Sequence, residues 1–309
     1  MTAVSFELSE FYTPPAVDEA ELAALPWQST TAAVRAGDFP FQVRVSHPDL
    51  AVHLDRLLAG LPPALAGDAL TTYSVLSGVG GHESWWAVYA DGQLISNVDQ
   101  PSAALSHLFA HLNRSVVEHS PADAVPLHAA ACGWRGAAAL IVGPSGSGKS
   151  TLAAGLGGRG LSYLTDEVAV VDRAELTVAP YAKPLTVKRG SWDVLAGLRP
   201  VVPAAIADVA ATQWHVAPSL LAGGVATAPH PVQLLLRCRW QQGSATTLRP
   251  VSRAGMVVDL AMDMFRPRER VPAQLEVLAR LARGALAYDL VYSDLEDASS
   301  AIVDLLERG

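Results

Sequence analysis

The chain has 309 residues, of which 50% are hydrophobic, and it carries a formal net charge of −8 at pH 7. This length predicts two domains or one large one. The acidic balance argues against nonspecific binding to nucleic acid, which needs clustered lysine and arginine. No uninterrupted apolar run reaches the roughly 18 residues of a membrane-spanning helix. We therefore expect neither nucleic acid nor a membrane as a partner.

The start of the chain and its cysteines favour a cytoplasmic location. Residues 1–7 lack the basic and apolar regions of a signal peptide. Two cysteines, Cys132 and Cys238, give neither a disulfide framework nor metal-ligand spacing. Cys132 lies among alanines and is expected to be a small buried hydrophobe rather than a nucleophile.

Residues 1–120 are expected to form an α/β module that serves as a scaffold or recognises a partner. They contain strand and helix patterns but no dense cluster of chemical groups. The patterns predict a strand at 41–45, a helix at 50–58, a hairpin across 85–96 that turns at Asp91-Gly92, and a helix from Pro101 to Val116.

Residues 121–309 are expected to form a second unit with an α/β core. The pattern breaks at 120–123, and residues 203–228, rich in Ala, Pro and Gly, predict no clear element. Mixed strands and helices around a loop favour this fold class. The predicted elements are strands at 127–132, 137–142 and 232–236, an apolar strand at 161–171 interrupted by an acidic pair, a helix at 254–264, and a helix–strand–helix across 272–307.

Residues 143–150 read Gly-Pro-Ser-Gly-Ser-Gly-Lys-Ser and match the phosphate-binding loop G-x-x-x-x-G-K-[ST] in full. A buried-strand pattern precedes the loop and a helix pattern follows it, the context in which backbone N–H groups converge on an anion. Lys149 is expected to reach the β- and γ-phosphates, and Ser150 to hold Mg²⁺. The sequence therefore predicts that ATP and Mg²⁺ bind at Gly143, Pro144, Ser145, Gly146, Ser147, Gly148, Lys149, Ser150 and Thr151.

Asp166 and Glu167 form the acidic pair, with Asp166 seventeen residues beyond Lys149. A neighbouring strand would bring Asp166 beside the phosphate loop. The simplest interpretation is the magnesium carboxylate that any NTPase of this kind needs, and a bare ATPase would explain Lys149, Ser150 and one acid.

These motifs resemble the HPr kinase/phosphorylase family, whose nucleotide fold is related to that of phosphoenolpyruvate carboxykinases. The resemblance covers about residues 125–175 and rests, in order, on His128, the loop 143–150, Arg159-Gly160 and Asp166-Glu167. It implies that Asp166 is the base that activates a serine hydroxyl on a protein substrate. It also implies that Glu167 is its acidic neighbour, that His128 assists near the transferred phosphate, and that the protein is a homo-oligomer. The implied metal ligands are Ser150, Asp166 and Glu167.

Several positions depart from the family pattern. Glu167 replaces an Asp, and Thr151 and Val187 each replace a Glu. The arginine-rich signature that serves HPr binding and phosphorolysis in the family is matched only weakly, by Arg249-Pro250. The departures fit divergent HPr-kinase-like proteins of peptide-modification systems better. Those proteins include lasso-peptide tailoring kinases, which phosphorylate a serine of a precursor peptide.

Other residues have weaker assignments. Without the resemblance, His128 on an apolar strand is more often a satisfied core histidine. Lys183 and Lys188 are expected to be solvated, although Lys188 and Arg189 are candidates to neutralise phosphate. Candidates for a phosphate clamp or a peptide groove are Arg249, Arg253, Arg266 and Arg268, and Trp214-His215 is expected to serve packing only.

The leading hypothesis is an ATP-dependent kinase that transfers the γ-phosphoryl group to a serine of a peptide or protein. A kinase for a small hydroxylated metabolite would use the same apparatus. A nucleotide-binding regulatory protein without transfer chemistry is the alternative from another class.

Overall fold

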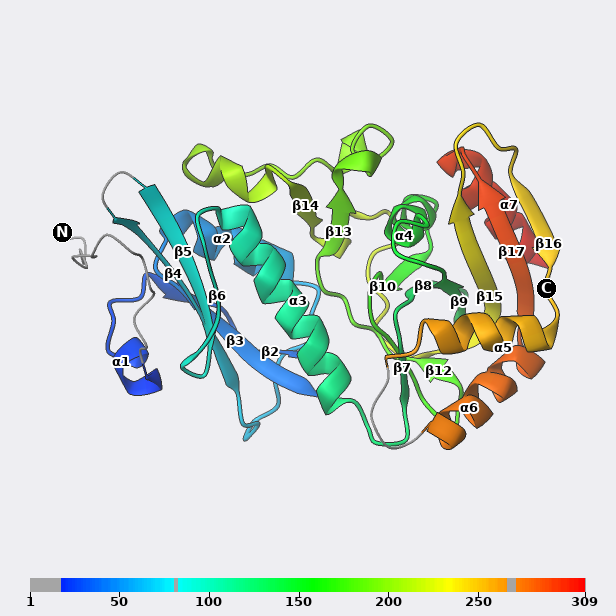
Figure 1. Ribbon diagram of the computed structural model, residues 1–309, viewed down its shortest axis with the longest axis horizontal. Coiled ribbons are helices and arrows are strands. Elements are labelled where there is room, and N and C mark those ends of the chain that lie inside the picture. The colour runs from blue at the N-terminus through cyan, green and yellow to red at the C-terminus, as the bar shows by residue number, and fades with distance from the viewer. Residues whose placement is uncertain (1–17, 81–82, 266–270, 309) are drawn as a thin grey trace.

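The computed structural model describes residues 18–80, 83–265 and 271–308, so residues 1–7, Arg266 and Arg268 lie outside the described part. Within that part the chain is mixed α/β, with two large sheets and helices packed on them (Figure 1). None of the described helices combines the length and apolarity that crossing a membrane requires.

The N-terminal sheet has six strands in the order β1-β3-β4-β5-β6, with β2 on β3. Strands β3 and β4 are parallel and α2 connects them, whereas β4, β5 and β6 are antiparallel neighbours. Its elements are α1 (Glu19–Ala23), β1 (Ser29–Thr30), β2 (Val34–Ala36), β3 (Phe39–Val45), α2 (Pro48–Leu58), β4 (Thr71–Gly80), β5 (Glu83–Ala90), β6 (Gln93–Val98) and α3 (Pro101–His119).

The second sheet has nine strands in the order β10-β8-β9-β15-β12-β11-β7, and β17 pairs with both β15 and β16. Strands β9, β15 and β17 run parallel, so their carboxyl ends meet at one edge. Its strands are β7 (Val125–Leu127), β8 (Ala130–Trp134), β9 (Ala137–Val142), β10 (Ser162–Thr165), β11 (Ala169–Val171), β12 (Thr177–Val178), β15 (His230–Trp240), β16 (Thr247–Pro250) and β17 (Leu286–Tyr292).

Helices cover both faces of this sheet. Ala139 and Ile141 of β9 belong to the apolar core under α4 and α7, whereas Leu140 and Val142 belong to the core under α5 and α6. Successive strand residues point to opposite faces, so a central strand buried on both sides is a continuous apolar run. The four helices are α4 (Lys149–Gly158), α5 (Arg253–Met262), α6 (Val271–Gly284) and α7 (Leu295–Arg308).

A two-stranded ribbon joins the two halves of the chain. It pairs β13 (Leu185–Lys188) with β14 (Gln213–Val216), and four 3-10 turns flank it, η1 (Arg189–Ser191), η2 (Ala196–Leu198), η3 (Ala204–Ala210) and η4 (Pro218–Leu220). The side chains of Gln213 and Ser106 are hydrogen-bonded at 2.7 Å, which ties the ribbon to α3. The apolar core of the N-terminal sheet also includes Tyr181, Ile206 and Val209. One apolar core thus contains residues from both sides of position 120, and the predicted domain boundary at this residue stays a prediction.

His215 of β14 is buried against the ring of Phe109 from α3, with 4.8 Å between ring centroids. Burial, together with the charges of Lys183 and His53, lowers the pKa of His215 to about 3. The unfolded chain therefore binds a proton at this residue between about pH 3 and pH 6.5 that the folded chain does not bind. Because only the unfolded chain takes up this proton, His215 lowers the free energy of unfolding as the pH falls below 6.5.

The free energy of unfolding of the wild type is expected to decrease between pH 8 and pH 5. In His215→Phe this decrease should be smaller by about 2 kcal/mol, because phenylalanine takes up no proton. Urea unfolding at the two pH values measures the loss in the variant and in the wild type. The control is His107→Gln, at an exposed position of α3. An equal loss in His215→Phe and the wild type would contradict this account of the buried ring.

Most predicted elements are confirmed, and two strands are divided. The helices expected from Pro101 and across 254–264, and the helix–strand–helix across 272–307, appear as α3, α5 and α6-β17-α7. The strand predicted at 127–132 is two strands, because β7 pairs with β11 while β8 pairs with β9, and His128 lies in the break. The run 161–171 is likewise divided into β10 and β11 at the acidic pair.

Candidate functional site

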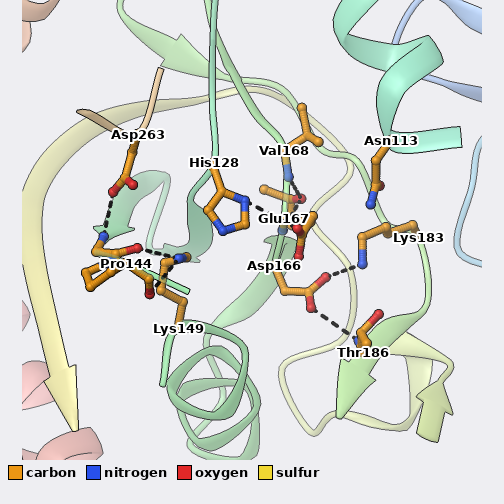
Figure 2. A network of polar contacts seen from close by, with 12 residues as sticks. Asn113, His128, Pro144, Lys149, Asp166, Glu167, Val168, Lys183, Thr186 and Asp263 are labelled. Atoms are coloured by element: carbon orange, nitrogen blue, oxygen red, sulfur yellow. Dashed lines mark hydrogen bonds and ion pairs between the residues drawn. The ribbon is translucent and has the colours of Figure 1, made fainter. Parts of the chain in front are cut away.

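The phosphate-loop motif lies between β9 and α4, as the sequence predicts. Gly143, Gly146 and Gly148 have φ angles of 142°, 83° and 98°, a region that L side chains rarely adopt. The loop therefore has the backbone that brings consecutive N–H groups to the N-terminus of a helix, where an anion is stabilised. Figure 2 shows Pro144 and Lys149 of this loop close to His128 and Asp263.

Lys149 is the first residue of α4, and its ammonium folds back over the loop. Its Nζ donates to the carbonyl oxygens of Gly143 at 2.5 Å and Pro144 at 3.4 Å. Burial lowers the pKa of Lys149 from its ordinary value of 10.5, against the opposing carboxylates of Asp263 and Glu167. An ammonium has three donors, so one N–H remains for a phosphate oxygen.

Asp263 supports the loop, and sequence reasoning missed it. Its carboxylate accepts a 2.6 Å hydrogen bond from the N–H of Gly143, while its backbone oxygen accepts from the N–H of His128 at 2.7 Å. Burial raises the pKa of Asp263 above 3.8, although the Gly143 N–H and Lys149 oppose the shift. No local motif marks this residue, because the contact links positions 120 apart in the sequence.

Tyr292, at the end of β17, closes the other side of the loop. Its hydroxyl donates to the carbonyl oxygen of Gly148 at 3.2 Å. A Cβ on residue 148 would overlap this hydroxyl, and the positive φ would be strained as well.

Gly148→Ala is therefore expected to lower the free energy of unfolding by about 1–2 kcal/mol through the left-handed backbone alone, and to weaken nucleotide binding. Urea unfolding and calorimetry with Mg·ATP measure the two effects. Tyr292→Phe in the same background removes the hydroxyl that the new Cβ meets and should restore part of the loss. No recovery in the double variant would show that the overlap is not the cause.

A cavity of about 530 Å³ opens over the loop. This volume lies in the range of small-molecule sites in proteins. Its lining comes from the loop and the start of α4, from the breaks that hold His128 and Glu167, from β13 and the segment after it, and from the ends of β15 and β17 and the start of α7. The lining residues are His128, Ser145, Gly146, Gly148, Lys149, Ser150, Thr151, Glu167, Thr186, Lys188, Gly190, Ser191, Asp193, Val194, Trp240, Tyr292, Ser293 and Leu295.

His128 and Glu167 form a polar pair in the wall of this cavity. The Nδ1 of His128 lies 3.3 Å from a carboxylate oxygen of Glu167, and both side chains are about one third exposed. Burial disfavours the charged form of Glu167, but the hydrogen bond from His128 and the charges of Lys183 and Lys149 outweigh it and lower its pKa below 4.5. Glu167 is therefore an ionised, accessible carboxylate beside the phosphate loop.

Asp166 does not line the cavity. It is fully buried, and its carboxylate accepts from Lys183 Nζ at 2.5 Å, from the Tyr163 hydroxyl at 2.7 Å and from the Thr186 N–H at 3.2 Å. Figure 2 shows the carboxylate directed toward Lys183 and Thr186, with Glu167 beside His128. The structure thus differs from the prediction of Asp166 as base: of the two neighbouring acids, Glu167 faces the cavity and Asp166 the interior.

Lys183 also differs from its prediction as a solvated surface residue. Its side chain is 1% exposed and is paired with Asp166, and its Nζ donates further to the carbonyl oxygen of Pro184 at 3.0 Å. Removing an ammonium from water is costly unless it is paired and hydrogen-bonded. The buried pair fixes the segment 183–186 against the acidic turn and so holds one wall of the cavity.

The predicted magnesium ligands are only partly brought together. Ser150 and Glu167 line one cavity with the loop, whereas buried Asp166 does not reach it. Among the described residues no group of three or more His, Cys, Asp and Glu side chains could hold a metal alone. Mg²⁺ usually binds one or two protein oxygens together with substrate phosphates and water, and Ser150 and Glu167 fit that pattern.

The cationic candidates are also separated. Lys188 lines the cavity, but Arg189 donates to the carbonyl oxygen of Ala211 and lies over the ring of Trp192. Arg249 and Arg253 are outside the cavity lining, and Arg159 pairs with Glu296 on α7. Of these cations only Lys188 is placed to meet a bound phosphate.

Cys132 is fully buried as predicted, and so is Cys238. Burial, with the nearby charge of Asp166, raises the pKa of the Cys132 thiol to about 12. Burial likewise raises the pKa of Cys238 to about 12. Neither thiol is a nucleophile at neutral pH.

Comparisons with known proteins assign this chain to no family. No protein-family model and no curated protein matches the sequence. Among solved structures, the chain is similar to the Hpr(Ser) kinase/phosphatase from Coxiella burnetii, with a TM-score of 0.30 and 12% sequence identity. The match covers 59% of this chain and 88% of that one. So distant a likeness carries no argument about function, which has to come from the site.

Proposed function

We propose that this protein is an ATP-dependent kinase that transfers the γ-phosphoryl group to a hydroxyl. One observation carries the proposal: the carboxylate of Glu167, in contact with His128, lines the same cavity as the phosphate-loop residue Lys149. A cradle for phosphate alone would serve a binding protein. A carboxylate beside the cradle adds a group that can take a proton from an acceptor.

The phosphate loop would bind the triphosphate through its backbone N–H groups and the N-terminus of α4. Lys149 and Lys188, both in the cavity lining, would neutralise charge on the phosphoryl oxygens. Mg²⁺ held by Ser150 and Glu167 would supply further neutralisation of the phosphate charge. Positioning and electrostatics account for most of the catalysis of phosphoryl transfer.

Glu167 would orient the acceptor hydroxyl and take its proton as the oxygen attacks phosphorus. The bond to the γ-phosphorus forms from the acceptor oxygen, and the bond to the β,γ-bridging oxygen breaks to release ADP. His128 would position the Glu167 carboxylate through the 3.3 Å contact. A carboxylate with a pKa below its ordinary value is a weak base, which suits a transition state in which the proton leaves late.

We propose a serine hydroxyl of a peptide or protein as the acceptor. The order of His128, the phosphate loop, Arg159-Gly160 and the acidic pair supports this choice through the resemblance to HPr kinases. Acceptor recognition carries no spacing motif comparable to the phosphate loop, so the choice needs a direct test.

The test is incubation with γ-labelled ATP, Mg²⁺ and serine-containing peptides encoded near the gene, with mass spectrometry of the products. We expect label on a serine of one peptide and none when Lys149→Ala replaces the wild type. A panel of hydroxylated metabolites serves as the second arm. Label that leaves ATP only as free phosphate in both arms would contradict the kinase assignment.

A further inference from the structure

Trp240 is an exposed aromatic residue in the wall of the cavity. It ends β15, is 48% exposed, and lines the cavity together with Gly148 and Lys149. A large indole that remains half exposed at the edge of a concave site is a surface that a ligand can cover. The proposed proton transfer does not use it.

The indole is held in place by the protein. Its Nε1 donates to the carbonyl oxygen of Ser293 at 3.2 Å, and the backbone N–H of Trp240 donates to the carbonyl oxygen of Ser147 at 2.8 Å. The first contact fixes the ring and the second fixes its backbone to the phosphate loop. A ring ordered before binding loses little side-chain entropy when a ligand stacks on it.

The strand order separates Trp240 from the proposed chemistry. Neighbouring strands in this part of the sheet follow the order β10-β8-β9-β15-β17, and the phosphate loop follows the central strand β9. Glu167 follows β10 and His128 precedes β8, on one side of the loop. Trp240 ends β15 and Ser293 follows β17, on the other side. A triphosphate whose terminal phosphate lies at Glu167 would therefore extend its nucleoside toward Trp240.

We propose that Trp240 is the platform on which the base of the nucleotide stacks. This inference rests on the proposed function for the direction of the bound triphosphate. The flat indole suits an aromatic base, and Leu295 also lines the cavity. Trp240 thus distinguishes a nucleoside triphosphate from a bare polyphosphate, which the loop alone binds.

The experiment compares Mg·ATP with inorganic tripolyphosphate by calorimetry, because only ATP carries a base. Trp240→Ala is expected to weaken Mg·ATP binding about 5- to 150-fold, which corresponds to the ~1–3 kcal/mol of one base stacked on an aromatic ring. Tripolyphosphate affinity should stay unchanged. Trp240→Phe keeps an aromatic ring and should stay within about threefold of the wild type for both ligands.

Equal losses of both ligands in Trp240→Ala would mean that the indole only supports the loop, and would overturn the inference. Equal affinity of the wild type for ATP and tripolyphosphate would also overturn it, while leaving the phosphate site intact. A wild type that binds neither ligand would contradict the proposed function, and this inference with it.

Discussion

Replacing Glu167 by Gln is expected to slow phosphoryl transfer by about 10²- to 10⁴-fold, the usual contribution of a positioned general base. Glutamine keeps the size of the side chain and still accepts a hydrogen bond from His128, but it takes no proton from an acceptor. Mg·ATP should still bind, although more weakly, because the phosphate loop, Lys149 and Ser150 are unchanged while the amide oxygen replaces a charged oxygen that holds Mg²⁺. Single-turnover transfer and calorimetry separate the two effects.

The matched control for this variant is Glu175→Gln, which removes a carboxylate from an exposed position of the turn before β12. It should transfer phosphate at the wild-type rate. Transfer by Glu167→Gln at the same rate as Glu175→Gln would remove Glu167 from the mechanism and leave the cavity as a nucleotide-binding site only.

The pH dependence of transfer offers an independent check on Glu167. Its pKa is lowered below 4.5, so the carboxylate becomes protonated, and transfer is lost, only as the pH falls below the ordinary glutamate range. Between pH 5 and pH 7 this group should leave the rate level. A fall in rate near neutral pH would identify another group as the base.

The second large effect is on stability. Lys183→Met is expected to lower the free energy of unfolding by about 3–5 kcal/mol, because it leaves the Asp166 carboxylate buried without its ionic partner. Methionine fills a similar volume, so loss of packing contributes little. Urea unfolding at pH 7 measures the change.

Combining Lys183→Met with Asp166→Asn should restore much of this loss, because the amide is neutral: its oxygen can still accept from the Thr186 N–H, and its NH2 group can donate to the Tyr163 hydroxyl. A double variant as unstable as Lys183→Met alone, or a single variant within about 0.5 kcal/mol of the wild type, would show that the buried pair does not hold this wall. The recovery also tests the placement of Asp166 in the interior rather than at the reaction centre.

The local parts of the site could be predicted from the sequence, whereas the parts made by distant contacts could not. The phosphate loop follows from eight consecutive residues, 143–150, and their flanking patterns. Asp166 and Glu167 are adjacent at a bend, and spacing along the chain does not say which of two neighbouring side chains faces the cavity. The buried Lys183, 17 residues from Asp166 in the sequence, pairs with Asp166 and so directs that side chain to the interior.

The residues that reasoning from sequence missed are those whose role depends on the order of strands in the sheet. Asp263 reaches Gly143 because β7 brings His128 beside the end of α5. Trp240 reaches the loop because β15 lies next to β9 in the sheet. Neither contact has a sequence motif, although an apolar strand that ends in tryptophan is a signal worth testing against a neighbouring phosphate loop.

The ribbon β13–β14 gives the N-terminal half a direct connection to the site. At one end Thr186 and Lys188 of β13 line the cavity, and along β14 Gln213 and His215 contact Ser106 and Phe109 of α3. The ribbon that carries Lys188 therefore packs against α3, the helix that covers the N-terminal sheet. Substitutions in this part of α3 are expected to affect the cavity as well as the N-terminal core.

Equilibrium binding of Mg·ATP to the wild type and to Lys149→Ala tests the central claim most directly. If residues 143–151 form a triphosphate site, the wild type binds Mg·ATP with one-to-one stoichiometry and the variant binds it about 10- to 100-fold more weakly, the effect of losing one or more hydrogen bonds to a charged group. Absence of binding by a folded wild type, or equal affinity of the two proteins, would contradict the account.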